Sequence, residues 1–126
     1  MPIVHIRALP QKPGVDVTAA LKLVCCDLAA FLQIPEQEVM GTWQTQELGK
    51  YVVGKAEAHG QPENSHPPMV QVFDFGGRPP QQVEQILLRV AQTLSAALGI
   101  NPANLFITYS EAVAGRTYSR GQIRRD

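Results

Sequence analysis

Residues 2–9, PIVHIRAL, return in a similar form at residues 68–75, PMVQVFDF. Each stretch starts with proline and continues with alternating, largely β-branched residues, a pattern that predicts a β-strand. Proline cannot donate a backbone hydrogen bond, but the first position of a strand tolerates it because no partner is needed there. The chain therefore contains the starts of two comparable strands, 66 residues apart.

The same shift of 66 residues brings the rest of the two halves into phase without a gap. Apolar residues in both halves follow the i, i+3, i+4, i+7 spacing of a helix with one buried face. Matched pairs are Leu21 with Leu87, Val24 with Val90, Leu28 with Leu94, Leu32 with Leu98, and Trp43 with Tyr109. The chain is therefore interpreted as two copies of one unit of roughly 60 residues, a size that seldom builds a stable core alone.

Each copy has the pattern strand, loop, helix, turn, strand. The strands are expected at residues 2–8, 39–44, 68–75 and 105–110. Asp16 is a predicted helix start and Gly99 a predicted helix end. A strand, helix and strand joined in this way form a βαβ unit, so the two strands of each copy are expected to be parallel and their connection right-handed.

The predicted fold class is α+β, an α/β sandwich in which two tandem βαβ units share a four-stranded sheet with both helices on one face. A pseudo-two-fold axis would relate the units. The first unit spans residues 1–55, an exposed connector spans residues 56–67, and the second unit spans residues 68–126 of a single domain. The other face of the sheet would lack a cover, which argues for an oligomer.

Composition limits the functional classes. The 126 residues are 44% hydrophobic, and Lys+Arg and Asp+Glu balance at 11 each, so there is no broad charge field for nucleic acid or a membrane surface. No apolar run is long enough to span a bilayer. Two adjacent cysteines and three histidines without ligand spacing predict no metal site. We expect a cytoplasmic protein, with the basic end, SRGQIRRD, as a solvated terminus.

The duplication, MPIVHI at residues 1–6 and LGINPANLFITYSEAVAG at residues 98–115 together resemble the tautomerase superfamily. The resemblance is to 4-oxalocrotonate tautomerase-like proteins in fused form. The chain is also similar to the macrophage migration inhibitory factor and 5-carboxymethyl-2-hydroxymuconate isomerase branches. The resemblance implies a homotrimer with sites built partly by a neighbouring subunit, and chemistry without a metal or organic cofactor.

The same resemblance implies that Pro2 is the catalytic residue. Once Met1 is cleaved, Pro2 carries a secondary amine, and an α-amino group titrates at about 8 in model peptides. Burial or nearby cations lower this pKa, so that a neutral amine can act as a general base near pH 7. Pro68 is internal, and its amide nitrogen has no basic lone pair. The implied function is a tautomerase or isomerase acting on an enol or unsaturated 2-oxo acid.

Lys12 and Arg78 follow Pro2 and Pro68 by ten residues, the spacing of the family's cation that holds a substrate carboxylate. Arginine is the better bidentate partner for a carboxylate, so Arg78 is preferred. For Lys12, a place on a solvated loop is the equal alternative. The other candidate substrate-binding residues are Tyr51, Phe106, Tyr109, Arg116 and Tyr118.

The expected carbonyl-polarising donor is missing. In the family the second strand of each unit often carries an arginine or tyrosine for this role, but Met40 and Phe106 occupy those positions. The loss of such a donor removes electrostatic stabilisation of an enolate. Candidate replacements are Tyr109, Tyr118, Trp43 and Arg116. For Tyr109 and Trp43, packing is the favoured interpretation.

Two other functions stay open. One is a lyase of the same superfamily, either a haloacrylate dehalogenase or hydratase or a 3-oxo acid decarboxylase, in which Pro2 is a protonated acid. Those branches usually place two arginines close together after the third strand, whereas Gly76 and Gly77 precede Arg78 here. The other is a non-catalytic trimeric binding module, which the missing polarising donor favours.

Overall fold

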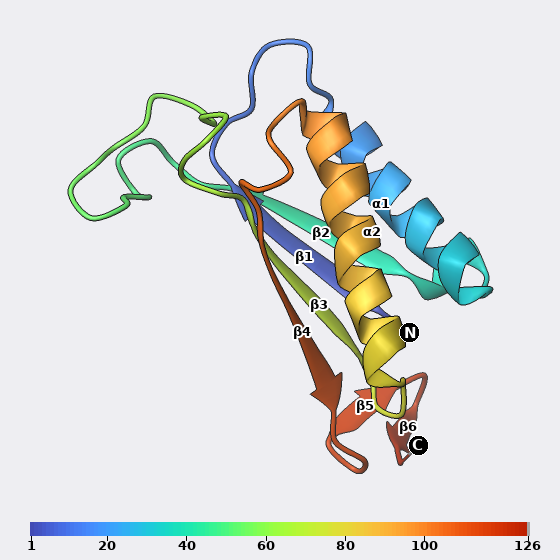
Figure 1. Cartoon of the computed structure of the whole chain (residues 1–126). Helices are drawn as coiled ribbons and strands as arrows, with labels where there is room; N and C mark the ends of the chain where they lie inside the picture. The colour runs from blue at the N-terminus through green and yellow to red at the C-terminus, as the bar shows by residue number, and fades with distance from the viewer. Residues whose placement is uncertain (126) are drawn as a thin grey trace.

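The computed structural model describes residues 1–125 and has two helices packed on a sheet (Figure 1). Its elements are β1 (Ile3–Ala8), α1 (Val17–Leu32), the short 3-10 helix η1 (Glu36–Glu38), β2 (Met40–Thr45), β3 (Met69–Phe75), α2 (Pro80–Leu98), β4 (Phe106–Ala112), β5 (Thr117–Ser119) and β6 (Gln122–Arg124). The four strands and two helices expected from the sequence are confirmed, with strand bounds that differ by at most two residues.

The main sheet has the strand order β2-β1-β3-β4. Strand β1 is parallel to β2, β3 is parallel to β4, and the central pair β1 and β3 is antiparallel. Within that central pair His5 lies opposite Gln71, which is its own equivalent in the repeat. The pseudo-two-fold axis therefore passes between these two residues, and the α/β sandwich of two βαβ units is confirmed.

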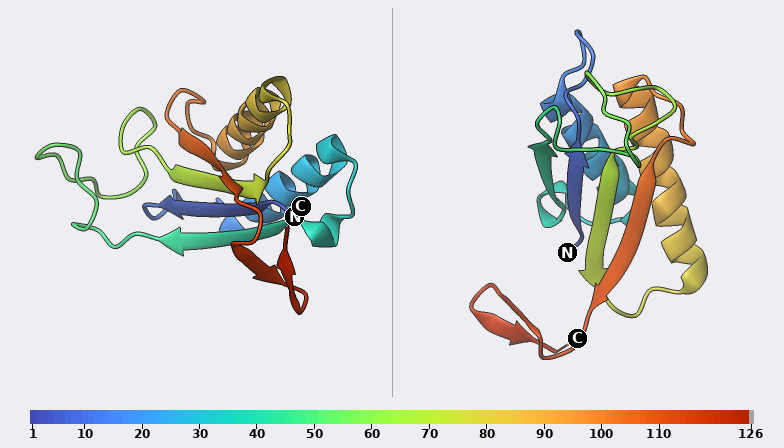
Figure 2. Two further views of the ribbon diagram at one scale, coloured as in Figure 1. Left: turned by 90° about the horizontal axis from the view of Figure 1, so that it is seen from below. Right: turned by 90° about the vertical axis from the view of Figure 1, so that its left-hand side faces the viewer.

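Both helices cover the same face of the sheet, as the two views in Figure 2 show. The core between the layers is formed by inward-facing strand residues and by the apolar stripes of the helices. Its fully buried side chains include Val4, Ile6, Val70, Val72, Val24, Leu28, Val90 and Leu94. On the outer face, His5 and Arg7 are exposed, as the alternation along β1 predicts.

The predicted helix ends are also observed. The Asp16 carboxylate accepts a hydrogen bond from the Ala19 backbone N–H at 3.0 Å and caps the start of α1. Gly99 ends α2 in a left-handed conformation with φ 68°. Within residues 1–125, neither helix has the length and apolar character needed to cross a membrane.

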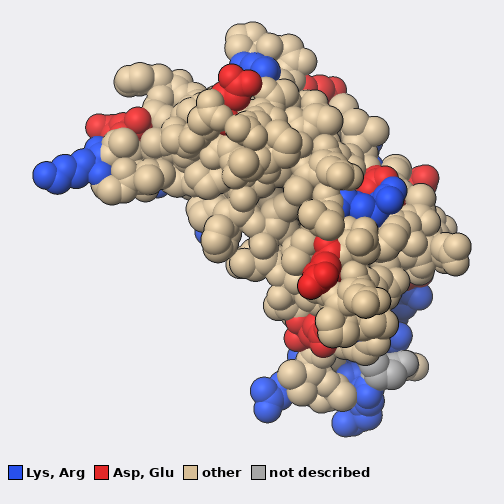
Figure 3. All heavy atoms as spheres, in the orientation of Figure 1, with Lys and Arg blue, Asp and Glu red and all other residues tan. Residues whose placement is uncertain are grey.

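The basic end of the chain is mostly exposed, as a solvated terminus requires, but it is paired in a hairpin and is not frayed. Strands β5 and β6 form an antiparallel hairpin in which Thr117 pairs with Arg124. The two residues of its turn, Arg120 and Gly121, have φ values of 51° and 77°, a combination that suits a tight hairpin. Figure 3 shows Lys and Arg side chains gathered where this hairpin extends from the end of β4.

Candidate functional site

The antiparallel centre of the sheet gives the molecule two related ends. Ile3 pairs with Phe73, so Met1 and Pro2 lie beside the end of β3. We call this the amino-terminal end. By the same symmetry Pro68 lies beside the end of β1, at what we call the connector end because residues 56–67 fold there. Each predicted site residue therefore belongs to one end or the other.

A cavity of about 330 Å³ opens at the amino-terminal end. Its lining residues are Met1, Asp74, Phe75, Gly76, Gly77, Arg78 and Gln82. Gly77 has φ +99°, a conformation that side chains rarely adopt, and the turn it makes lies between β3 and α2. This turn places Arg78 so that its guanidinium contacts Asp74, the second-last residue of β3.

Asp74 is the centre of a buried polar cluster. Its side chain is 1% exposed, and its Oδ1 accepts a hydrogen bond from the Phe75 backbone N–H at 2.8 Å. Its Oδ2 accepts hydrogen bonds from Arg78 Nε and from the Tyr109 hydroxyl, the latter at 3.3 Å. The Met1 amino group lies 3.7 Å from Oδ1. A buried carboxylate is costly unless it is paired and hydrogen-bonded, and Asp74 is both.

Sequence reasoning missed Asp74, although a signal for it exists. Along β3, Val70, Val72 and Asp74 alternate on the buried face, so a charged residue continues a row of core positions. The repeat places Ala8, which is fully buried, at the equivalent position of β1. A carboxylate at a core position whose duplicate is alanine could have been singled out.

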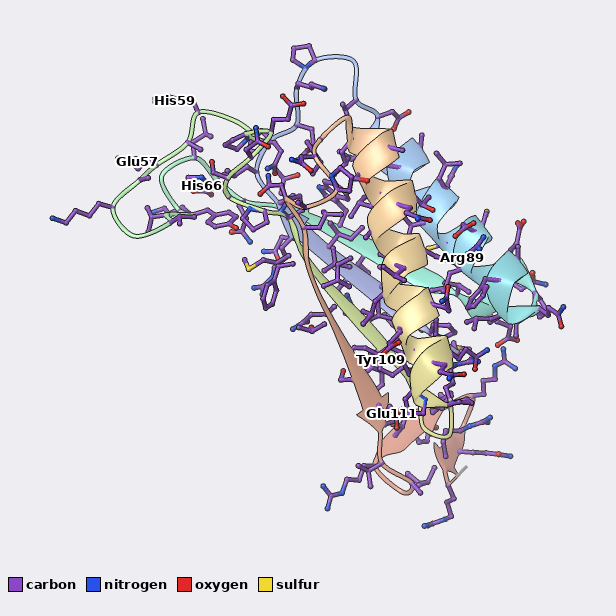
Figure 4. The ribbon with its side chains drawn as sticks, in the orientation of Figure 1. Glu57, His59, His66, Arg89, Tyr109 and Glu111 are labelled. Carbon is purple, nitrogen blue, oxygen red and sulfur yellow. The ribbon has the colours of Figure 1, made fainter. Side chains whose placement is uncertain are left out.

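Tyr109 joins β4 to this cluster. Its ring packs against the core, as the packing interpretation predicts, and its hydroxyl also bonds Asp74. Burial, and then the charges of Asp74 and Glu111, raise the pKa of Tyr109 to about 12, although Arg78 acts in the opposite direction. The hydroxyl is therefore a proton donor at neutral pH. Figure 4 shows Tyr109 and Glu111 near the start of α2.

Lys12 does not reach this end of the chain. It lies at the connector end, and its Nζ donates a hydrogen bond to the Gly99 carbonyl at 2.9 Å. This carbonyl belongs to the residue that caps α2, so the ammonium stabilises the negative end of that helix. Lys12 is exposed on the loop between β1 and α1, in agreement with the solvated-loop alternative, and within one chain it lies at the opposite end of β1 from Pro2.

Tyr51 and Phe106 also lie at the connector end. The Tyr51 hydroxyl donates to the Pro67 carbonyl at 2.7 Å, and its ring packs edge-on against His66. Phe106 begins β4, donates its backbone N–H to the Pro68 carbonyl, and is 59% exposed. Within one chain the structure therefore separates Lys12, Tyr51 and Phe106 from Pro2.

The connector end has a cavity of its own, of about 360 Å³. Its lining residues are Pro10, Gln11, Lys12, Pro13, His59, Gly60, Gln61 and Pro62. The connector is held against the loop after β1 by a hydrogen bond from the Gln61 backbone N–H to the Pro10 carbonyl at 2.8 Å. Figure 4 shows His59 on this connector, with His66 further along it.

The hairpin after β4 supplies the remaining predicted residues. Arg116 is exposed and Tyr118 is 70% exposed, and neither lines the cavity. The hairpin does bring Arg124 to this end, with its guanidinium carbon 6.0 Å from the centre of the Phe75 ring. Phe75 lines the cavity, so Arg124 is a further cation near its wall that the sequence did not single out. Met40 starts β2 and donates its backbone N–H to the Pro2 carbonyl at 3.0 Å.

Two βαβ units around one pseudo-two-fold axis, with a proline beginning the first strand of each, define the tautomerase fold. A family model described as tautomerase enzyme matches residues 49–115, and the chain belongs to that family. The resemblance found in the sequence is therefore confirmed. A search of curated proteins found no match.

Solved structures share the fold at low sequence identity. A structure of Pt0534 inactivated by 2-oxo-3-pentynoate is 15% identical, with a TM-score of 0.82 over 98% of this chain and 95% of that one. F6 fused 4-OT, described as an asymmetric trimer, is 16% identical, with a TM-score of 0.79 over 96% and 94%. N1, a member of the cis-3-chloroacrylic acid dehalogenase family, is 16% identical, with a TM-score of 0.74 over 97% and 82%.

Proposed function

We propose that this protein is a cofactor-independent tautomerase that uses the amine of Pro2, freed by removal of Met1, as a general base. The substrate class is an enol or unsaturated 2-oxo acid. The observation that carries the proposal is the cavity at the amino-terminal end, because Met1 and Arg78 both line it. The equivalent residue at the other end, Pro68, has only an amide nitrogen.

The geometry supports a division of roles between Pro2 and Arg78. Arg78 uses Nε to bond Asp74, and its two terminal nitrogens make no hydrogen bond within residues 1–125. They are therefore free to pair with both oxygens of a substrate carboxylate. The neutral Pro2 amine then takes a proton from the carbon or oxygen next to the conjugated system, forming an N–H bond. It returns this proton to the other end of that system, so the amine is regenerated.

A homotrimer is part of this proposal. The uncovered sheet face supports it, and so does the trimeric assembly of F6 fused 4-OT. We propose that a neighbouring subunit brings Tyr51 and Phe106 of its connector end to the site. For the polarising donor, Tyr118 and Arg116 of the hairpin remain the candidates, because Met40 has no hydrogen-bond donor in its side chain.

The decisive experiment replaces each of the two equivalent prolines. Pro2→Ala is expected to lower the rate of phenylenolpyruvate or 2-hydroxymuconate tautomerisation by about 100-fold or more, since positioned general bases contribute on that order. Pro68→Ala is the matched control and should retain the rate, because an internal residue has no amine. Mass spectrometry of the native protein checks that Met1 is removed. An unchanged rate in Pro2→Ala would refute the proposal.

One observation favours a second candidate function, a lyase. The Asp74 carboxylate lies 3.7 Å from the nitrogen of Met1, so an anion would stand close to the amine that removal of Met1 gives Pro2, and a nearby anion favours the protonated form of an amine. A protonated Pro2 would act as an acid, as in hydration of a 3-chloroacrylate or decarboxylation of a 3-oxo acid. NMR titration of the Pro2 nitrogen separates the two functions. A low titration point with enol turnover supports the tautomerase, and a high one with dehalogenation supports the lyase.

A third outcome of the same experiment is a binding module. Absence of turnover on phenylenolpyruvate, 2-hydroxymuconate and 3-chloroacrylates, together with an ordinary amine titration, would support a protein that binds carboxylates without converting them. The missing polarising donor at Met40 and Phe106 is the observation behind this outcome.

A further inference from the structure

We propose that Asp74 is a positioning residue of the amino-terminal site, which holds Arg78 by its Nε edge so that the terminal nitrogens of the guanidinium face a substrate carboxylate. The inference rests on the proposed function and deepens it, because it assigns a role to a residue that touches no substrate.

Two hydrogen bonds fix the orientation of the Asp74 carboxylate. Oδ1 is held by the Phe75 backbone N–H at 2.8 Å, and Oδ2 by the Tyr109 hydroxyl at 3.3 Å. The two donors come from different strands, β3 and β4, so the carboxylate plane is set by the sheet itself. A group held in this way can in turn orient a third partner.

That third partner is Arg78. Its Nε donates to Oδ2, and its side chain is 23% exposed while that of Asp74 is 1% exposed. The guanidinium therefore spans from the buried carboxylate to the cavity wall. Since guanidinium is planar, fixing Nε also fixes the direction of the two terminal nitrogens. A flexible arginine would lose conformational entropy each time a ligand bound, and this one is ordered in advance.

The other copy of the repeat has no equivalent of the Asp74–Arg78 ion pair. At the connector end the buried position is Ala8, and Lys12 bonds the Gly99 carbonyl instead of a carboxylate. The same unit therefore folds without the ion pair. Buried ion pairs contribute little to stability compared with apolar residues of similar volume, so stability alone does not account for Asp74.

The Asp74–Arg78 pair lies at the amino-terminal end of the molecule. Asp74 and Arg78 line the one cavity that Met1 also lines, of the three described cavities within residues 1–125. The end at which Pro2 is proposed to present its amine is thus the end with an oriented guanidinium. The two features together suit a substrate with a carboxylate and an acidic proton in the same small molecule.

The test compares an acid with its neutral ester. KM and kcat are measured for phenylenolpyruvate and for its methyl ester with the wild-type chain and with Asp74→Asn. Asparagine keeps the shape but has no negative charge and only one acceptor oxygen, so it cannot accept from both the Phe75 N–H and Arg78 Nε. We expect KM for the acid to rise about tenfold, as for a misplaced charge-assisted pair, while KM for the ester changes little. Any change in kcat should be the same for acid and ester, because both use the same amine.

The matched control is Asp27→Asn. Asp27 also pairs with an arginine, Arg89, through bonds of 3.1 Å and 2.7 Å, but this pair joins the two helices away from the cavity. It is expected to change neither KM. An equal rise in KM for acid and ester in Asp74→Asn, or an unchanged KM for the acid, would overturn the inference.

A folding role is tested separately. Asp74→Ala copies the residue that the other half uses, and it should fold and show the same selective loss for the acid. If Asp74→Asn and Asp74→Ala both unfold, the carboxylate serves the fold and the inference is overturned. Circular dichroism of each variant decides this point.

The experiment also separates this inference from the proposed function. If Pro2→Ala keeps full turnover, the proposed base is refuted, but the comparison of acid and ester still tests Asp74. If the wild-type chain shows no turnover, binding of phenylpyruvate and its methyl ester is followed by NMR in its place. Equal weakening of both ligands in Asp74→Asn would then count against the positioning role.

Discussion

The two ends of the molecule share one backbone plan and differ in chemistry. Each has a proline before a strand, a cation ten residues later and an aromatic ring on the last strand of its unit. At the connector end Lys12 donates a hydrogen bond to the Gly99 carbonyl at the end of α2, and the nitrogen of Pro68 is an amide. At the amino-terminal end the cation bonds Asp74 beside the Met1 amine.

In a duplicated chain, positions at which the two copies differ in polarity are the first candidates for functional residues. The positions that agree between the copies are mostly those of the core, since both units must pack on one sheet. The positions that disagree in polarity, such as Ala8 and Asp74, have no such common reason. The contrast between the two ends predicts how substitutions at Ala8, Arg78, Tyr109 and Lys12 change stability and substrate binding.

The largest effect is expected from Ala8→Asp, which gives the connector end the carboxylate of the other end. Ala8 is fully buried, and Lys12 there is turned to Gly99, so the new carboxylate would have no cation in place. A buried unpaired charge costs about 3 kcal/mol or more. Urea unfolding should show this loss, whereas Asp74→Ala should lose less, because the Arg78 left behind is 23% exposed and can reach water. Similar losses in the two variants would contradict the contrast.

The second effect concerns the arginine itself. Arg78→Lys keeps the charge but removes the planar donor pair, so KM for a 2-oxo acid substrate should rise about tenfold. Lys12→Arg makes the reverse change at the connector end and should leave KM within about twofold, because Lys12 bonds a backbone carbonyl there. Steady-state kinetics of both variants measures this. Equal effects would show that both cations hold substrate.

Features that depend on residues close together in the chain could be predicted from the sequence, whereas contacts between residues far apart in the chain could not. The strands and helices follow from local alternation and periodicity, and the repeat confirms each half by the other. The meeting of Met1 with Arg78 at one cavity depends on the antiparallel pairing of β1 with β3, which is a long-range feature. Spacing along the chain alone therefore predicts the same substrate-binding role for Lys12 and Arg78, although the two residues lie at different ends of the molecule. Asp74 escapes notice because its partners, Arg78 and Tyr109, come together only in the folded sheet.

The third effect is a change in alkaline stability. The pKa of Tyr109 is raised from 10.0 to about 12 in the folded chain, by burial first and then by Asp74 and Glu111. Between these values the unfolded chain has lost the Tyr109 proton and the folded chain has kept it, so rising pH favours unfolding there. The stability that Tyr109 contributes is full below pH 10 and is lost as pH rises to about 12.

Tyr109→Phe removes this contribution. The variant should lose about 1 kcal/mol at neutral pH with its hydrogen bond to Asp74, and its stability should fall less steeply between pH 10 and 12. Some alkaline loss should remain, because burial also raises the pKa of Tyr51. Urea unfolding across this pH range measures both quantities. The slope should stay as in the wild type for Tyr118→Phe, whose side chain is 70% exposed. A Tyr109→Phe slope equal to that of the wild type would mean that neither burial nor the charges of Asp74 and Glu111 keep the proton on the Tyr109 hydroxyl.

The smallest effect is expected at Lys12, and it decides whether the two cations have separate tasks. Lys12→Gln removes the charge at the end of α2, where a cation is worth under about 1 kcal/mol and is screened by salt. The variant should therefore be slightly less stable at low ionic strength, match the wild type at high ionic strength, and keep its KM. A loss of substrate binding without a loss of stability would place Lys12 in a neighbouring subunit's site. The connector end would then supply a second cation, in addition to the proposed Tyr51 and Phe106, to a site whose amine and Arg78 come from the amino-terminal end of the neighbouring subunit.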